Sequence, residues 1–504
     1  MSTFRTATLL AITCSLAAPF VGGRLAEAAS PVVSEGPRVR VECGVQVQAT
    51  ADKARAVVEA TLSLAEARLP YKLPEGRKIA VFLHASTEAY DDAVRVAGEA
   101  PTVELSKTLE ATRESHVLVA PRSEVAYLAL VDDLPELTRY HLAYATVYQF
   151  LLRVEAPRLE WWPTWYLEGL SGTIALDVVS ASAATSGATS GATAKDAPRP
   201  LIVDGVLDQL REASATGRVF PIPRLVFAEA VALPLARRMQ AHWVGLYRVL
   251  EAEPEKLAKL HDVINRLPPP PLPEPDARDF RSLAFSHACA ARLYEIFGSA
   301  EDLGAKLRAY AASVAPRWFD VLHWSQLAGD ELISAAPIGS TAIAINETPA
   351  PGAPFSITCE MRIEDLGAKD MKQGEIYLGY ERRDDARFAK VTFQSGFVTL
   401  LVYSDGVWQE RMKVNVKVEA ADVVVGDWLP VKVTVGNGLL RVEVRDKKLA
   451  ELPAPEGLDL LRGRVGVGAM DGLVRFRKIV VAALPPPTPP SDGPAAPGSV
   501  TPPK

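Results

Sequence analysis

A strict alternation of apolar and polar residues constrains the C-terminal third of this chain more than any other feature. Within residues 342–484, apolar residues occupy every second position in four runs: Phe355 to Ile363, Met412 to Val418, Val431 to Val435, and Val442 to Val444. A period of two places successive side chains on opposite faces of a strand, so each run predicts a strand with one face in a core. Gly436-Asn437-Gly438 is typical of the tight turn between two such strands. The region therefore predicts an antiparallel β-sandwich of the jelly-roll type.

A helical period replaces this alternation between residues 137 and 319. Its clearest part spaces apolar and aromatic residues at intervals of three and four: Leu137, Tyr140, His141, Tyr144, Val147, Tyr148, Leu151 and Leu152. Such spacing predicts a helix with one buried face. The preceding segment is mixed, with helices expected over 51–68 and 87–97 and strands over 78–83 and 116–120. The chain is thus expected to be multidomain α+β, with a mixed and then mainly helical domain at 40–325 before the sandwich at 342–484.

Three compositionally biased segments interrupt these patterns. Residues 180–200 contain a repeat of Ala, Thr, Ser and Gly, residues 268–275 are rich in proline, and residues 485–504 form a Pro-rich end. Such compositions are typical of flexible or extended chain. We expect a low-complexity insertion within the helical domain at 180–200 and a disordered tail at 485–504.

The first residues have the three parts of an export signal. Arg5 is followed by an apolar run over 7–21 and by the small residues Ala26 and Ala28. This order predicts a signal peptide over 1–29, and hence a secreted or periplasmic protein that could be surface-associated. No later stretch reaches the roughly 20 apolar residues of a transmembrane helix.

Charge and cysteine content narrow the remaining classes. The net charge is −6, and the basic residues form no cluster, which argues against a nucleic-acid partner. Three cysteines follow the predicted signal peptide: Cys43, Cys289 and Cys359. An odd, scattered set defines no disulfide framework, so either one disulfide or three buried thiols is compatible with the sequence.

Two consecutive stretches carry a resemblance to a known family. Residues 140–152 (YHLAYATVYQFLL) and 162–170 (WPTWYLEGL) resemble the active-site helices of gluzincin-type, peptidase MA-like zinc metallopeptidases. That family has a His-Glu-x-x-His helix followed by a Pro-x-Trp-x-x-Glu-Gly helix. The resemblance implies two histidines and a downstream glutamate as zinc ligands, and the glutamate of the first motif as the general base.

Two of these four positions have lost the required residue. His141 matches the first histidine and Glu168 matches the third ligand, whereas Leu142 replaces the general base and Ala145 replaces the second histidine. A catalytic zinc site normally needs three protein ligands and a water. We therefore expect no catalytic residue, no bound metal and no cofactor, with His141 and Glu168 as vestigial positions. A core role for His141, and a hydrogen bond to His141 or a helix cap for Glu168, would also account for these residues.

The sandwich region resembles a second group of proteins. Residues 426–433, 440–444, 461–468 and 471–479 are similar to concanavalin-like and laminin-G-like domains, including the 3-keto-disaccharide hydrolase-like family. The resemblance implies a glycan-binding surface. Aromatic rings are the side chains expected to pack on sugars, and the candidates are Tyr377, Tyr380, Tyr403 and Trp408.

These expectations combine into one hypothesis and one alternative. The hypothesis is an exported, non-catalytic, peptidase-like protein with a lectin-like sandwich that binds peptide or glycan, by either part, at the cell envelope. The alternative is an active hydrolase, either a zinc metallopeptidase with a rearranged site or a glycan-active enzyme. Zinc is a cofactor only in this alternative.

Overall fold

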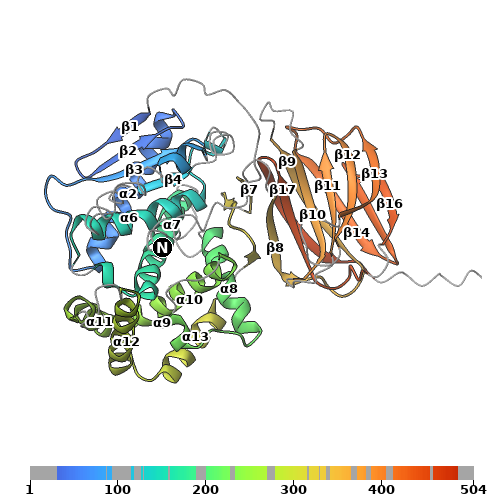
Figure 1. The fold of residues 1–504 in the computed structure, drawn as a ribbon. Helices are drawn as coiled ribbons and strands as arrows, with labels where there is room; N and C mark the ends of the chain where they lie inside the picture. The colour runs from blue at the N-terminus through green and yellow to red at the C-terminus, as the bar shows by residue number, and fades with distance from the viewer. Residues whose placement is uncertain are drawn as a thin grey trace, which may run out of the picture.

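The computed structural model describes most of the chain between residues 31 and 485. The described residues are 31–86, 88–93, 115–118, 127–128, 130–156, 159–188, 200–227, 233–268, 278–314, 317–327, 330–335, 341–364, 372–381, 388–403, 412–454 and 458–485. A small sheet and a group of helices make up the N-terminal part, and a β-sandwich makes up the C-terminal part (Figure 1). The predicted multidomain α+β architecture with an antiparallel sandwich is confirmed.

A four-stranded sheet opens the chain. Its strands are β1 (Val32–Glu35), β2 (Val39–Cys43), β3 (Ile79–His84) and β4 (Ser115–Leu118), in that spatial order. The β1–β2 pair is antiparallel, and the β2–β3 and β3–β4 pairs are parallel. Alternate residues of β3 are buried, and helix α2 (Gln48–Arg68) packs against β1 and β2. The strand expected at 78–83 and the helix expected at 51–68 are thereby confirmed within three residues at their ends. The strand expected at 116–120 is confirmed over 116–118, and residues 119–120 lie outside the described residues.

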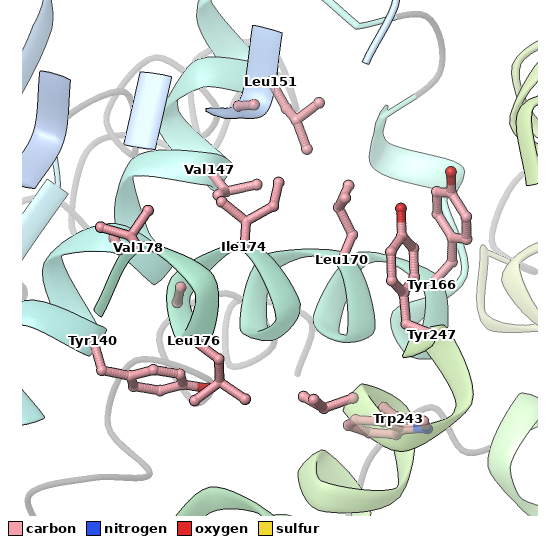
Figure 2. Close-up of a cluster of buried hydrophobic side chains, with 14 of the residues drawn as sticks. Tyr140, Val147, Leu151, Tyr166, Leu170, Ile174, Leu176, Val178, Trp243 and Tyr247 are labelled. Carbon is pink, nitrogen blue, oxygen red and sulfur yellow. The ribbon is translucent and has the colours of Figure 1, made fainter. Parts of the chain in front are cut away.

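The helices that follow surround a second, larger part of the same core. They are α6 (Glu136–Arg153), the short 3₁₀ helix η1 (Leu159–Trp161), α7 (Thr164–Ala188), α8 (Leu201–Ala215), α9 (Ile222–Val226), α10 (Leu233–Glu251), α11 (Pro254–Arg266), α12 (Arg278–Phe297) and α13 (Ala300–Ser313). Helix α7 packs against both α6 and α10, and Figure 2 shows Leu170 and Ile174 of α7 among the buried side chains of this core. The helix expected around Leu137 to Leu152 is α6.

Two glycines allow α7 and α10 to pack closely. A Cβ atom at Gly169 would lie 2.7 Å from the carbonyl oxygen of Trp243, and one at Gly172 would lie 2.6 Å from Val244 Cγ2. Both distances are shorter than a Cβ atom tolerates from a non-bonded oxygen or carbon atom. The position of Glu168 therefore depends on a helix contact that has no room for larger residues.

One biased segment differs from its prediction. Helix α7 continues through Ala188, so the first part of the 180–200 segment is helical rather than flexible or extended. Alanine favours helix strongly enough to outweigh the nearby serine, threonine and glycine. Of the helix expected at 87–97, residues 88–93 are helical. The signal peptide at 1–29, residues 189–199, most of 268–275 and the tail beyond 485 lie outside the described residues.

Two packed sheets form the sandwich. Its strands are β5 (Trp318–Phe319), β6 (Trp324–Gln326), β7 (Leu332–Ser334), β8 (Thr341–Pro349), β9 (Phe355–Ile363), β10 (Gln373–Tyr380), β11 (Phe388–Gln394), β12 (Gly396–Tyr403), β13 (Met412–Ala420), β14 (Leu429–Gly436), β15 (Leu439–Val444), β16 (Lys447–Pro453), β17 (Arg464–Met470) and β18 (Val474–Ala483). Within the described residues, the β10 sheet has the order β13-β12-β11-β10-β17-β8-β5, and the β9 sheet has the order β16-β15-β14-β9-β18-β7-β6. Every pairing is antiparallel.

The sandwich begins earlier in the chain than the alternation indicates. Strands β5, β6 and β7 cover residues 318–334 and belong to the two sandwich sheets, whereas the sequence divides the domains between 325 and 342. Strands of two or three residues are too short to display a period of two. The joint between the two parts therefore lies near residue 317.

Three acidic side chains of the helical part hold this joint. Asp204 Oδ2 accepts a hydrogen bond from Arg317 N at 3.1 Å, and Asp208 Oδ2 lies 3.4 Å from Asp320 N. Glu136 Oε1 accepts from a third backbone amide of the same segment, at Gln326. The three acids are buried. The first strands of the sandwich are thus fixed to α6 and α8 through their backbone.

The three cysteines that follow the predicted signal peptide are not paired in disulfides. Cys43, Cys289 and Cys359 are free and buried, and burial raises the pKa of both Cys289 and Cys359 to about 12. Of the two alternatives for these cysteines, the structure has the buried thiols.

In the part of the chain that the structure describes, no helix combines the length and apolarity needed to cross a membrane.

Candidate functional site

The α6 positions that the resemblance matches to a peptidase site have different environments. Leu142 is completely buried in the core, and Ala145 is also buried. His141 is half-buried and lies beside Tyr140, with ring centroids 5.9 Å apart. Among the described residues, no group of three or more His, Cys, Asp or Glu side chains gathers as metal ligands would. The general-base position therefore belongs to the core.

Glu168 has two phenols as its hydrogen-bond partners. It lies in the first turns of α7 and is 3% exposed. Tyr148 Oη donates to Glu168 Oε1 at 2.7 Å, and Tyr144 Oη donates to Glu168 Oε2. The expectation that Glu168 bonds to His141 is not met by these contacts. Nor does Glu168 cap a helix, because α7 begins four residues earlier, at Thr164.

A ladder of tyrosines supplies these phenols. Tyr140, Tyr144 and Tyr148 are spaced four residues apart on α6, so they share one helical face. Their neighbouring ring centroids are 6.0 and 5.7 Å apart. Sequence reasoning assigned these rings to a buried apolar face and missed their hydroxyl groups. The signal that could have revealed them is the repeat of tyrosine at every fourth residue.

Burial sets the protonation of this cluster. It raises the pKa of Glu168 to about 7, although the hydrogen bonds from Tyr144 and Tyr148 act to lower it. Burial also raises the pKa of both tyrosines well above 10, and the nearby Glu168 charge adds to this effect. Among the described residues no basic side chain forms an ion pair with Glu168. The carboxyl group is consequently held by neutral donors alone.

A second cluster lies on the face of the β10 sheet that points away from the sandwich core. Strand register places Glu375, Thr392 and Thr399 in one row across β10, β11 and β12, and Tyr377 beside Lys390 in the next row. The intervening residues, such as Ile376 and Val391, belong to the core. We call the face defined by Glu375, Tyr377, Lys390, Thr392, Phe397, Thr399 and Tyr403 the non-core face.

A buried ion pair lies in this face. Lys390 Nζ lies 2.5 Å from Glu375 Oε1, and their side chains are 5% and 0% exposed. Tyr377 Oη donates to Glu375 Oε2 at 2.6 Å, and burial raises the pKa of Tyr377 well above its ordinary value. A Cβ atom at Gly468 would lie 2.6 Å from the Tyr377 ring. The ring therefore occupies space that this glycine leaves open.

The four predicted sugar-binding rings have different environments. Tyr377 is 0% exposed and Tyr380 is 8% exposed, so neither offers the open surface that a sugar platform needs. Strand alternation places a residue on a face, but it does not tell whether other side chains cover that face. Tyr403 is half-buried and stacks on Phe388 with centroids 4.7 Å apart. Trp408 lies outside the described residues.

One half-buried ring on this face, that of Phe397, was not among the predicted sugar-binding residues. Phe397 is the second residue of β12 and lies on the non-core face, and the Lys417 ammonium lies 3.9 Å from its ring centroid. Thr399 and Tyr403 follow on the same face of the strand. Phe397 follows Gly396, and a glycine followed by an aromatic residue is common where a turn leads into a strand. The sequence therefore did not mark Phe397 as a binding residue.

Comparisons with known proteins find similarity only among solved structures. No family model matches the chain. No curated protein matches it either. Among solved structures it is similar to a carbohydrate-binding module, CBM66 from Bacillus subtilis, at 11% identity over 32% of this chain and 91% of the module, with a TM-score of 0.27.

Two other solved structures cover a similar share of the chain. Sheep galectin-11 matches at 11% identity over 29% of this chain and 98% of its own, with a TM-score of 0.22. A family 7 alginate lyase matches at 11% identity over 37% of this chain and 88% of its own, with a TM-score of 0.24. These identities and TM-scores are low, and the three likenesses assign neither a ligand nor an activity to this chain.

Proposed function

We propose that this protein is an exported carbohydrate-binding protein, and that the non-core face of the β10 sheet binds the glycan. The observation that carries the proposal is the composition of this face. It combines two half-buried aromatic rings, near the two ends of β12, with the buried threonines Thr392 and Thr399 and a buried ion pair. A sheet face that only contacts solvent keeps its charged side chains exposed, whereas the charges of Lys390 and Glu375 are buried.

Sugars present an apolar ring face and a rim of hydroxyl groups. Aromatic rings pack on the former, and a small number of fixed polar groups orient the latter. Phe397 and Tyr403 are six residues apart on one strand, which corresponds to about 20 Å at the rise of a β-strand. This spacing suits an oligosaccharide better than a single sugar.

The buried ion pair supports a functional role for the face. Removing Glu375 and Lys390 from water costs several kcal/mol per ion, and their attraction often does no more than offset that cost. Apolar residues would stabilise the fold at least as well. We infer that the pair is retained because it fixes the Tyr377 hydroxyl and the charges beneath the glycan.

The helical part acts in this proposal as a peptidase-like scaffold without catalysis. Leu142 is buried where a general base is required, and Glu168 is engaged by Tyr144 and Tyr148. These contacts favour a non-catalytic role over the alternative of a rearranged zinc peptidase. The signal peptide that the sequence predicts over residues 1–29 would place this action outside the cytoplasm, at the cell envelope.

Glycan-array binding of the chain from residue 30 onward, followed by affinity electrophoresis with the best ligand, tests the proposal. Loss of one stacking ring is worth about 0.5–1.5 kcal/mol, so Phe397→Ala is expected to weaken binding about two- to ten-fold. Tyr403→Ala is expected to act similarly. Leu439→Ala is the matched control, because it removes an exposed apolar side chain from the β9 sheet. Equal affinity in all three variants would remove the non-core face as the binding site.

A further inference from the structure

The geometry points to a second site, independent of the glycan proposal. We propose that Tyr144, Tyr148 and Glu168 bind one ferric ion. The three side chains come from two helices, and their oxygen atoms meet at hydrogen-bond distance. Tyr144 and Tyr148 are half-buried, so the cluster lies at the margin of the core and not in its centre.

The distance between Glu168 and Tyr148 is one that two ligands of the same metal ion can have. Each carboxylate oxygen of Glu168 faces a different phenol, and Glu168 Oε1 lies 2.7 Å from Tyr148 Oη. In an octahedral site with bonds of about 2.0 Å, neighbouring ligand oxygens are about 2.8 Å apart. A cation that replaces the two phenolic protons therefore needs only small shifts of the side chains.

The charge of the cluster favours a trivalent ion. Glu168 is almost completely buried, and no basic side chain among the described residues forms an ion pair with it. An unpaired buried carboxylate is costly, and neutral phenols bring no positive charge. When Fe³⁺ binds, Tyr144 and Tyr148 each release one proton to solvent. Two phenolates and one carboxylate then carry three negative charges, which balance the three positive charges of the ion.

The donor atoms also select the metal. All three are hard oxygen donors, and sulfur is absent from the set. A divalent ion bound to two phenolates and a carboxylate would leave a net negative charge in a buried site, which burial disfavours. Fe³⁺ matches the set in both charge and hardness.

Visible absorption provides a direct test, because phenolates bound to Fe³⁺ give a charge-transfer band. The chain from residue 30 onward is titrated with ferric nitrilotriacetate at pH 7.5. We expect a coloured complex at one equivalent of iron, together with a high-spin ferric EPR signal. Tyr144→Phe and Tyr148→Phe are each expected to weaken iron binding about ten-fold or more, and Glu168→Gln is expected to do the same.

Tyr140→Phe is the matched control. Tyr140 belongs to the same tyrosine ladder, but its hydroxyl accepts a long hydrogen bond of 3.4 Å from Gln240 Nε2 instead of contacting Glu168. This variant is expected to keep the band and the affinity. Absence of a band in the unmodified protein would overturn the proposal without any variant. A band that survives both Tyr144→Phe and Tyr148→Phe, or a Zn²⁺ complex that depends on His141 and excludes iron, would overturn it as well.

Discussion

Glu136 Oε1 lies 3.0 Å from the backbone nitrogen of Gln326, so the first turn of α6 is joined directly to strand β6 of the sandwich. The other carboxylate oxygen, Oε2, accepts from Ile202 N at 2.8 Å, at the N-terminus of α8. Ser325 Oγ in turn accepts from the backbone nitrogen of Glu136 at 3.1 Å. One side chain thus connects two helices and a strand.

Replacing this side chain should weaken the joint. Glu136→Ala leaves two buried backbone N–H groups without an acceptor, and each such group costs about 1–3 kcal/mol. We expect the free energy of unfolding in urea, followed by tryptophan fluorescence, to fall by about 2–5 kcal/mol. Glu255→Ala, which removes an exposed acid from the first turn of α11, should change it by less than about 0.5 kcal/mol. Equal stability of the two variants would contradict the role of Glu136.

His261 should make the protein less stable in acid. Burial lowers its pKa from 6.5 to about 4, and its two ring nitrogens lie 2.8 and 3.1 Å from the hydroxyls of Tyr166 and Tyr71. Between pH 6.5 and 4 the unfolded chain therefore binds a proton that the folded chain does not. The contribution of His261 is fully present above about pH 6.5 and declines as pH falls through that range, by about 1–2 kcal/mol at pH 5.

The test compares slopes of stability against pH. Glu136 and Glu168 have raised pKa values, and their contributions are lost as pH rises from about 4.5 to 7, which is the opposite direction. His261→Gln keeps hydrogen-bonding groups near both tyrosines but cannot be protonated. Its unfolding free energy should therefore fall less between pH 7.5 and pH 5 than that of the unmodified protein. Parallel curves would show that His261 does not carry the effect.

A methyl group added at Gly172, in the contact between α7 and α10, should destabilise the protein. Gly172→Ala places a carbon 2.6 Å from Val244 Cγ2, and overpacking of this kind costs about 1–3 kcal/mol. Gly304→Ala in α13 meets nothing closer than 3.3 Å, from a flexible arginine. It should be neutral or stabilising by up to about 1 kcal/mol, since alanine favours helix over glycine. Thermal unfolding of both variants distinguishes the two effects, and a lower melting temperature for Gly304→Ala alone would refute the argument.

The buried pair of the non-core face should show strong coupling. Lys390→Met leaves the Glu375 charge without its cation, which costs about 3–5 kcal/mol. Lys390→Met combined with Glu375→Leu removes both charges and should recover most of that loss. A double-mutant cycle measured by urea unfolding gives the coupling energy. Additive losses would mean that the two side chains do not interact.

Long, regular elements could be predicted from the sequence. The run from Phe355 to Ile363 is strand β9, and the run from Leu137 to Leu152 lies within α6. Both are long enough for their period to be recognised, and both bury one face. Strands β5 to β7 could not be predicted, because two or three residues show no period and their partners lie far along the chain.

The candidate sites were less accessible to sequence reasoning. The absence of a glutamate at Leu142, where the resemblance implies a general base, follows from the sequence alone. The pairing of Glu168 with Tyr144 and Tyr148 depends on how α6 packs against α7. Periodicity likewise gives the face on which Tyr377 lies. The burial of its ring depends on the space above Gly468, which belongs to a strand about ninety residues later.

The joint near residue 317 has a mechanical consequence. Acidic side chains of α6 and α8 accept hydrogen bonds from backbone amides within 317–326. The helical part and the sandwich are therefore not joined by a freely rotating linker. A sandwich anchored to a surface polysaccharide would hold the tyrosine ladder of α6 in one orientation toward that surface. Force applied to the sandwich would therefore be transmitted to the helical part. The two parts would move as one rigid unit and not as two domains on a flexible linker.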